Sequence, residues 1–319
     1  MKILVTPRSV TRAGHPSLNR IGEAGYQVVF CTPGEQPSET ELRTLLPGCV
    51  GYIAGVEPVT AAVLDAAPDL RVISRNGTGT DTVDVEAAHK RGIQVLRAEG
   101  ANARGVAELA IGQIFALARS SAASDAALKS GTWKRASAGT EIEGRTLGIL
   151  GCGRIGKQVA RMALGVGMQV LAFDQFPDPA FCPGQGFRYG GWEAVLAEAD
   201  FLSLHCPPNS EGEPVLGREA LGRLKRGCMV VNTARYDVMD AEAVLAALES
   251  GHLGGLALDV FDTEPPMDWR LVKHPRVVAT PHIGGFTRES IDRAMSQAVD
   301  NLLGGLRLDG CFGMERKSA

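Results

Sequence analysis

The chain has 319 residues, of which 45% are hydrophobic and 22% charged, and its formal net charge is -3. This length is comfortable for two domains, and the composition is that of ordinary globular proteins with sizeable cores. The basic residues are scattered, so neither a nucleic-acid partner nor a membrane surface is predicted. No apolar run approaches the roughly 18 residues of a membrane span, and the N-terminal residues become polar too quickly for a signal peptide. We therefore expect a cytoplasmic protein.

The chain contains seven cysteines, which form no C-x-x-C pair. Several of them lie within apolar, strand-like runs, so we interpret them as reduced, mostly buried side chains. Cys152 and Cys206 are the two for which a reactive thiol is an alternative. No metal site is predicted.

Up to about residue 100, short apolar runs alternate with amphipathic segments. The runs predict strands at residues 2–6, 26–30, 50–54, 71–74 and 93–96, with helices such as 60–67 and 83–91 between them. Strands separated by helices are typical of a parallel sheet that is covered on both faces. The first hundred residues therefore predict a doubly wound domain.

A segment with helical apolar spacing, 107–118, is expected to carry the chain into a second domain. Further strands are predicted at residues 147–150, 169–173, 201–204, 229–232, 255–259 and 277–280. A helix at 287–303 would return to the first domain. The predicted fold class is α/β, with two doubly wound parallel-sheet domains. We expect a Rossmann dinucleotide-binding domain (101–283) to be inserted into a flavodoxin-like substrate domain (1–100 and 284–319).

The most informative motif is G-C-G-R-I-G, which directly follows a strand-like apolar run. Its first glycine permits a sharp turn from strand to helix, its second lets the backbone approach a pyrophosphate, and its third lets the helix pack closely on the strand. The helix start then presents free N–H groups and a positive dipole end to the anion. The residues of this motif that are expected to bind the cofactor are Gly151, Gly153, Arg154, Ile155 and Gly156.

The next predicted strand ends in Asp174, about 20 residues after the glycines. A carboxylate at this place accepts hydrogen bonds from the hydroxyl groups of the adenosine ribose. A 2′-phosphate would be repelled by it and would need a nearby cation, whereas Gln175, Phe176 and Pro177 follow. The predicted cofactor is therefore NAD rather than NADP. The alternative is an ordinary strand-to-helix turn with a surface Asp.

Polar residues that follow predicted strands are candidates for chemistry, because ligands of open parallel sheets lie beyond the carboxyl ends of the strands. Arg235 suits bidentate pairing with a substrate carboxylate. His282 suits proton transfer because an ordinary imidazole titrates near neutrality, and Glu264 would orient its ring and favour the imidazolium. Each residue alone is more simply a surface or capping group. Their convergence beside a NAD site predicts an enzyme that acts on a 2-hydroxy acid.

Five segments, taken together and in order, resemble the D-isomer-specific 2-hydroxyacid dehydrogenase family, and they are most similar to its 3-phosphoglycerate dehydrogenase branch. The likeness extends from about residue 50 to about residue 300. The segments are 74–81 (SRNGTGTD), 147–156 (LGILGCGRIG), 231–235 (VNTAR), 257–265 (ALDVFDTEP) and 280–285 (TPHIGG).

The resemblance implies specific roles for these residues. The catalytic trio would be Arg235, Glu264 and His282. The further cofactor-binding residues would be His205, Thr233 and Asp259, the last two near the nicotinamide. Asn76, Gly77, Thr78 and Gly79 would bind the substrate carboxylate through their backbone N–H groups. Residues 106–135 would form an arm that builds a homodimer.

This chain departs from the family pattern at several residues, and these departures bear on which substrate it uses. Tyr236 and Asp237 follow the predicted catalytic Arg, where two small residues are usual, and Phe286 also replaces a small residue. Phosphoglycerate enzymes often place an Arg near residue 54, and none is present here. Arg75 and Arg135 are the candidates that remain for binding a second anionic group, with a surface role as the alternative for each.

The leading hypothesis is an NAD-dependent dehydrogenase for a D-2-hydroxy acid, with a second anionic group such as phosphate, phosphonate or sulfonate on its substrate. Within the same class, the alternative is a glyoxylate or hydroxypyruvate reductase with a small neutral pocket. From another class, the alternative is an NADH-sensing co-regulator that binds partner proteins, since the family includes such proteins. The complete catalytic trio favours an enzyme.

Overall fold

A computed structural model describes residues 1–133, 135, 138–209 and 212–315, with side chains described up to residue 307. The chain divides into two compact units. The first combines Met1–Asn102 with Arg288–Ala319, and the second is Ala103–Thr287. Residues 316–319, which the sequence analysis assigns to the substrate domain, lie outside the described residues.

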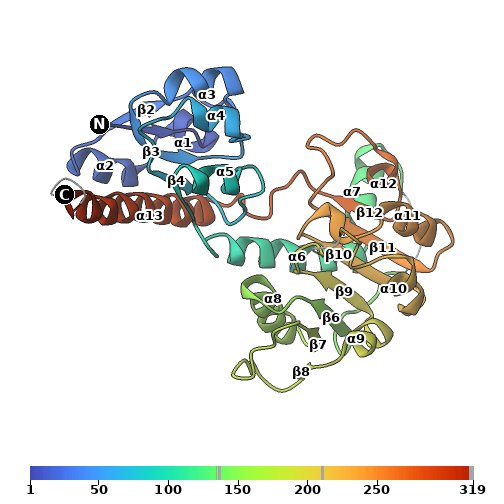
Figure 1. Ribbon diagram of the computed structural model, residues 1–319. Coiled ribbons are helices and arrows are strands. Elements are labelled where there is room, and N and C mark those ends of the chain that lie inside the picture. The colour runs from blue at the N-terminus through green and yellow to red at the C-terminus, as the bar shows by residue number, and fades with distance from the viewer. Residues whose placement is uncertain (134, 136–137, 210–211, 316–319) are drawn as a thin grey trace. The chain divides into compact units, whose positions relative to one another are not determined.

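The first unit contains a five-stranded parallel sheet in the order β2-β1-β3-β4-β5, of which Figure 1 labels β2, β3 and β4. Its strands are β1 (Lys2–Val5), β2 (Gln27–Phe30), β3 (Cys49–Ala54), β4 (Val72–Arg75) and β5 (Gln94–Arg97). In the register of this sheet Val5 pairs with Ile53, and Ile53 pairs with Ser74. This is the flavodoxin-like strand order, and it brings the carboxyl ends of the strands to one edge.

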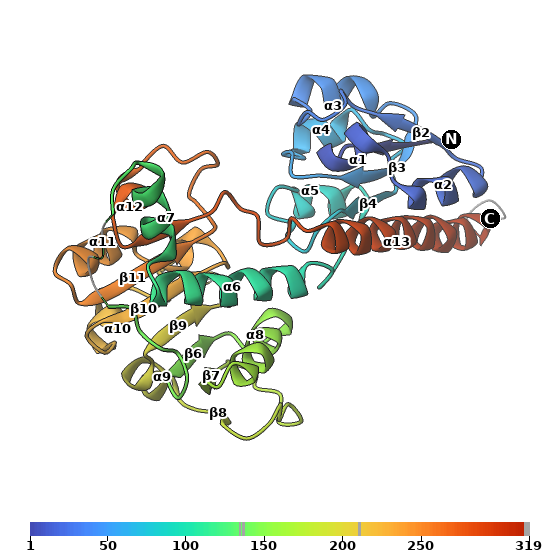
Figure 2. The same cartoon turned by 180° about the vertical axis from the view of Figure 1, so that it is seen from behind.

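Helices cover both faces of this sheet. They are α1 (Arg8–Ala13), η1 (Pro16–Leu18), α2 (Asn19–Glu23), α3 (Glu39–Leu45), α4 (Ala61–Asp65), α5 (Val85–Lys90) and α13 (Arg288–Glu315). Side chains of α1, η1, α2 and α13 form one core, and those of α3, α4 and α5 form the other. Local sequence starts several helices, since Ser38, Thr60 and Asp84 accept backbone N–H bonds as N-caps. Figure 2 shows α13 lying along the sheet.

The second unit contains a seven-stranded parallel sheet in the order β12-β11-β10-β9-β6-β7-β8. Its strands are β6 (Thr146–Leu150), β7 (Gln169–Phe173), β8 (Phe187–Tyr189), β9 (Phe201–Leu204), β10 (Cys228–Asn232), β11 (Leu253–Leu258) and β12 (Val277–Ala279). The chain begins this sheet with β6 and adds β7 and β8 toward one edge. It then returns to add β9 on the other side of β6, followed by β10, β11 and β12 toward the opposite edge. This is the Rossmann order, in which ligands bind where the winding reverses.

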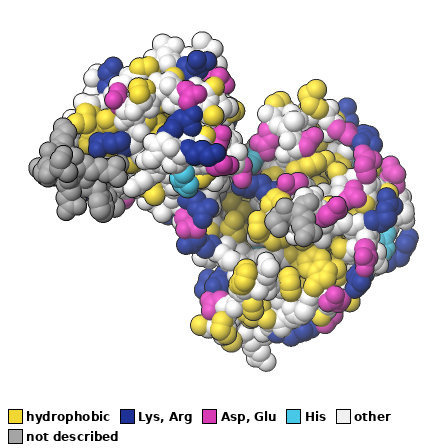
Figure 3. All heavy atoms as spheres, in the orientation of Figure 1, with side chains coloured by type: hydrophobic (Ala, Val, Ile, Leu, Met, Phe, Trp, Pro, Cys, Tyr) yellow, Lys and Arg dark blue, Asp and Glu magenta, His cyan; other side chains and the backbone are white. Residues whose placement is uncertain are grey.

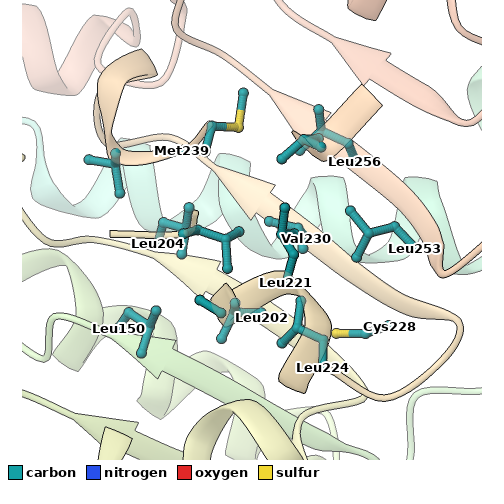
Figure 4. Close-up of a cluster of buried hydrophobic side chains, with 14 of the residues drawn as sticks. Leu150, Leu202, Leu204, Leu221, Leu224, Cys228, Val230, Met239, Leu253 and Leu256 are labelled. Atoms are coloured by element: carbon teal, nitrogen blue, oxygen red, sulfur yellow. The ribbon is translucent and has the colours of Figure 1, made fainter. Parts of the chain in front are cut away.

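Two cores cover the faces of the second sheet. Its helices are α6 (Ala103–Ala118), α7 (Ser121–Lys129), α8 (Arg154–Gly165), α9 (Trp192–Glu198), α10 (Arg218–Arg223), η2 (Tyr236–Val238), α11 (Ala241–Glu249) and α12 (Arg270–Lys273). Helices α6 and α8 form one core with the sheet. Helices α9 to α12 form the other, in which Leu202, Val230 and Leu256 face Leu221 and Leu224 (Figure 4).

The predicted fold class is confirmed, with differences in detail. Strand β8 was not predicted, because it has only three residues and follows a stretch rich in Gly and Pro. Two predicted strands end one residue too late, since β11 ends at Leu258 and β12 at Ala279. The next residues, Asp259 and Thr280, leave the strands and use their side chains in a turn. The return helix is longer than predicted.

None of the helices in the described part of the chain has the length and apolar character needed to span a bilayer. The same part of the chain contains no group of three or more His, Cys, Asp or Glu side chains that could hold a metal ion. On the face drawn in Figure 3, basic and acidic side chains are interspersed over each unit. That face therefore offers no extended surface of a single charge.

Candidate active site

Except for Arg135, the predicted site residues of the second unit lie at one edge of its sheet. All its strand pairs are parallel, so the carboxyl ends of the strands share that edge. An extended ligand laid along the edge would meet these residues in sheet order. In that order they are Asp174 after β7, the glycine turn after β6, His205 after β9, Arg235 after β10, Glu264 after β11 and His282 after β12.

The glycine turn is as tight as its sequence predicts. Gly151 has a φ of +91°, and a Cβ there would lie 2.6 Å from the backbone nitrogen of Cys206. A Cβ on Gly156 would lie 2.1 Å from the Gly151 carbonyl oxygen. Each of these two positions therefore requires glycine.

The start of α8 leaves room for an anion. A Cβ on Gly153 would meet nothing within 4 Å, and no side chain caps the helix that follows. Arg154 is exposed as the first residue of α8, and the partly buried Ile155 packs against the core. The first-turn N–H groups thus have no capping side chain, and the space beside Gly153 is open, as pyrophosphate binding requires.

Asp174 directly follows β7 and lies beside the glycine turn. Its Oδ2 accepts a hydrogen bond from Cys152 N at 2.7 Å, and its Oδ1 accepts one from Phe176 N at 2.8 Å. These bonds orient the carboxylate. Since an ionised carboxyl group has about four acceptor positions, it can also accept hydrogen bonds from ribose hydroxyls.

Two buried polar atoms farther along the edge have no hydrogen-bond partner among the described residues. They are Nδ1 of His205 and Oγ1 of Thr233. Burial lowers the pKa of His205 to about 4, so the ring is neutral, and its Nε2 lies 2.8 Å from Ser203 Oγ. Buried polar atoms normally have partners. The two atoms, the open helix start and Asp174 therefore fit a bound dinucleotide.

The lowered pKa of His205 predicts an acid-sensitive folding equilibrium. Part of the residue remains exposed, but its Nδ1 is buried. Between pH 6.5 and about pH 4, the unfolded chain binds a proton that the native ring does not. The free energy of unfolding should therefore fall by up to about 3 kcal/mol as the pH drops through this window.

His205→Gln should remove that part of the pH dependence. Denaturant unfolding of the ligand-free protein at pH 7 and near pH 4.5 measures it in both proteins. An equal loss of stability in the variant would show that another group causes the acid sensitivity.

The turn that carries Arg235 is held by Asn232, which is fully buried at the end of β10. Asn232 Oδ1 accepts from Ala234 N at 3.0 Å, and its Nδ2 donates to the Arg235 carbonyl oxygen at 2.8 Å. The Arg235 residue itself is exposed. Asn232 was missed from the sequence, where its only signal is a polar residue that closes an apolar run.

Glu264 and His282 form a close pair. His282 Nδ1 lies 2.6 Å from Glu264 Oε1, and the two side chains are 49% and 43% exposed. With Nδ1 engaged in this way, Nε2 is the nitrogen that can exchange a proton with a substrate. His282 has a φ of +53°, a left-handed conformation that costs a residue with a side chain about 1–2 kcal/mol. The surrounding structure must hold this conformation.

Asp259 holds the His282 turn in this conformation through hydrogen bonds to its carboxylate. It is 1% exposed, and its Oδ1 accepts from Thr280 Oγ1 at 2.6 Å and from Ile283 N at 2.9 Å. Its Oδ2 accepts from Gly284 N at 2.8 Å. The carboxylate therefore binds the turn on both sides of His282. The nicotinamide contact that the resemblance implies for Asp259 stays a prediction, while the structure adds a role within the protein.

In the first unit, the predicted substrate-binding residues begin at the end of β4. Arg75 is the last residue of the strand and is only 8% exposed, with Nη1 3.5 Å from the Ala54 carbonyl oxygen. Asn76 N donates to the same carbonyl group at 2.9 Å. The buried Oδ1 of Asn76 has no partner in the described part of the chain.

The remaining predicted residues lie in loops. Gly77, Thr78 and Gly79 are partly buried beyond β4, where Thr78 Oγ1 donates to Asn102 Oδ1 at 3.2 Å. Arg135 lies in the second unit, where it is exposed. Its neighbours at 134, 136 and 137 lie outside the described residues. The two candidate anion contacts, Arg75 and Arg135, are thus carried by different units.

The chain resembles proteins of known class over most of its length. Residues 111–284 match the family model described as D-isomer specific 2-hydroxyacid dehydrogenase, NAD binding domain. The D-3-phosphoglycerate dehydrogenase of Mycobacterium leprae is 39% identical over 83% of this chain and 51% of its own length. The hydroxypyruvate reductase of Thermotoga maritima is 38% identical over 84% of this chain and 88% of its own. This chain therefore spans about half the length of the phosphoglycerate dehydrogenases that it matches.

Solved structures give the same result for the fold. The TT0316 protein from Thermus thermophilus superimposes with a TM-score of 0.85 and 37% identity, covering 96% of this chain and 97% of that one. The chain belongs to the D-isomer-specific 2-hydroxyacid dehydrogenase family. Its second unit contains the NAD-binding domain of that family, which confirms NAD as the cofactor.

Proposed function

We propose that this protein is an NAD-dependent oxidoreductase that interconverts a D-2-hydroxy acid and its 2-keto acid. One observation carries the proposal: a His–Glu pair and an Arg lie beyond the carboxyl ends of three adjacent strands, at the same sheet edge as the glycine turn. In this proposal the first unit is the substrate domain. Its loop beyond β4 binds the substrate carboxylate through backbone N–H groups.

Each residue of the site has its own role in this proposal. Bound NAD supplies the hydride acceptor, and its reduced form supplies the hydride. Arg235 binds the carboxylate and the oxygen on the reacting carbon, because its planar guanidinium presents paired donors. His282 Nε2 gives a proton to the carbonyl oxygen during reduction and takes it back during oxidation. Glu264 orients the ring and stabilises its charged form. Asn232 and Asp259 hold the turns that carry Arg235 and His282.

A panel of 2-keto acids, assayed with NADH and with NADPH, tests the proposal. The panel includes neutral, phosphorylated and sulfonated members. We expect oxidation of NADH with at least one keto acid, with the D-isomer of the 2-hydroxy acid as the product, and weaker activity with NADPH. If the folded protein binds NADH but reduces no keto acid, the enzyme proposal fails and the NADH-sensing alternative is favoured.

For the substrate, we propose a 2-hydroxy acid that carries a second anionic group, with glyoxylate or hydroxypyruvate reduction as the alternative. Likeness to phosphoglycerate dehydrogenases supports the first, and a match that covers 88% of the length of a hydroxypyruvate reductase supports the second. Arg75→Ala distinguishes them. A large rise in KM for doubly anionic substrates only would favour the first, and an equal effect on all substrates would favour the second.

We also propose a homodimer built by the arm 106–135, of which Lys134 lies outside the described residues. Helix α7 has no buried residue, and Leu128 and Trp133 are 57% and 84% exposed, which supports burial of this arm by a second copy.

The described cysteines are all free thiols, which supports a location in the reducing cytoplasm.

Asp174→Ala should weaken the binding of NAD and reduce the preference of the enzyme for NAD over NADP. The ribose loses an acceptor, and the 2′-phosphate no longer meets a negative charge. The measurement is the ratio of kcat/KM for the two cofactors. Asp174 also accepts from Cys152 N and Phe176 N, and Asp174→Asn keeps one of these two acceptor oxygens. It serves as a second variant, and the thermal midpoint of each variant is the control for turn geometry. An unmoved ratio in both variants would remove Asp174 from the ribose site.

A further inference from the structure

Gln113 is the one polar side chain on the buried face of α6. It is 2% exposed, and the residues three or four positions away on the same face, such as Ala110 and Leu117, are apolar. Helix α6 packs with this face toward α8 and strands β10, β11 and β12. A buried amide in such a place costs free energy unless its polar atoms have partners.

The Gln113 amide bonds to the turn that carries His282. Its Nε2 donates to Thr280 Oγ1 at 3.1 Å, and the Thr280 hydroxyl donates to Asp259 Oδ1 at 2.6 Å. The direction of both bonds follows from chemistry. An ionised carboxylate only accepts, so the hydroxyl uses its single proton there and must accept from the amide.

The same carboxylate accepts the backbone N–H groups of Ile283 and Gly284, directly after His282. Hydrogen bonds in such a chain strengthen one another. The bond from Gln113 therefore reinforces the bond from Thr280 to Asp259. Together they hold a turn in which His282 keeps its left-handed backbone.

Stability alone does not account for the amide. Gln113 Oε1 is buried without a hydrogen-bond partner among the described residues. A methionine of similar size would fill the same space and leave no polar atom unsatisfied. An amide that leaves one of its own polar atoms unsatisfied but supports the turn beside a candidate catalytic residue points to a role in the site.

We propose that Gln113 is a positioning residue for His282, acting through Thr280 and Asp259. It touches no reacting atom. It holds the 280–284 turn so that the imidazole stays on Glu264 with Nε2 presented to the substrate. The inference rests on the proposed dehydrogenase function.

Gln113→Met tests this role with three measurements on the full chain. We expect kcat for keto-acid reduction to fall about tenfold, because small displacements of a catalytic group are costly, with KM for NADH and keto acid nearly unchanged. Amide hydrogen exchange at Ile283 and Gly284 should become faster. The thermal midpoint should stay the same or rise.

Two further variants sharpen the experiment. Leu117→Met changes the same face of α6 without touching the turn, and it should leave all three measurements close to those of the wild type. Thr280→Val removes the hydroxyl through which Gln113 acts. Adding Gln113→Met to it should therefore cause no further loss of kcat.

Wild-type kcat and unchanged exchange in Gln113→Met would overturn the inference. A lowered thermal midpoint, with a similar loss of activity in Leu117→Met, would also overturn it by assigning Gln113 to core stability. If the wild-type protein reduces no keto acid, the proposed function fails instead. Amide exchange still tests the hold on the turn in that case, because it requires no substrate.

Discussion

Arg235→Lys should lower kcat/KM for the keto acid at least a hundredfold, on the order of 3 kcal/mol of transition-state stabilisation. A lysine keeps the positive charge but has a single ammonium group, so it cannot reproduce a planar, two-pronged contact with the carboxylate and the carbonyl oxygen. Steady-state kinetics with the best keto acid of the panel measures the loss.

The turn itself should survive this change. The two bonds from Asn232 to the backbone of Ala234 and Arg235 hold it without the guanidinium, whose Nη1 also donates to the Ala234 carbonyl oxygen at 2.8 Å. Cofactor affinity and thermal midpoint should therefore stay near the wild-type values, and they serve as controls. Near wild-type turnover in the Lys variant would remove Arg235 from the substrate site.

His282→Ala should abolish most of the turnover, and Glu264→Gln should shift the pH dependence of both reaction directions. Reduction needs the imidazolium, so its rate should fall toward high pH. Oxidation needs the neutral ring, so its rate should fall toward low pH. A carboxylate 2.6 Å from Nδ1 favours the cation. Its removal should therefore move both midpoints toward lower pH.

Glu264→Gln retains a side-chain oxygen that can still accept from Nδ1, so the shift reports the charge more than the orientation of the ring. The profiles must be measured where chemistry limits the rate, as judged by a kinetic isotope effect with deuterated NADH. If both midpoints stay in place, the two residues do not act as a catalytic pair.

Much of the fold could be predicted from local patterns. The strands at 169–173 and 201–204 match the structure residue for residue, because their apolar runs are sharply bounded. The ends of β11 and β12 were misplaced for a reason that local patterns do not contain. Asp259 and Thr280 bond to each other through their side chains just beyond these two neighbouring strands, although they are 21 positions apart in the chain.

The candidate site likewise combines residues that sequence motifs predict with residues that only the fold brings together. The glycine turn, Asp174, Arg235 and the Glu264–His282 pair could be found from motifs, because each follows a recognisable strand. Supporting residues could not, since Gln113 and Thr280 are 167 positions apart and meet only through the fold. The available signal was a glutamine within the apolar spacing of a helix.

The discontinuous first unit has a consequence for synthesis on the ribosome. Its core joins Ile3, Ile53 and Val72 to Val299 and Leu302 of α13. At 5–20 residues per second, the intervening second unit takes roughly 10–40 s to emerge. During that time one apolar face of β1, β3 and β4 has no helix from residues 288–315 to cover it. Residues 1–102 are therefore synthesised before the second unit, but their core is completed only after it.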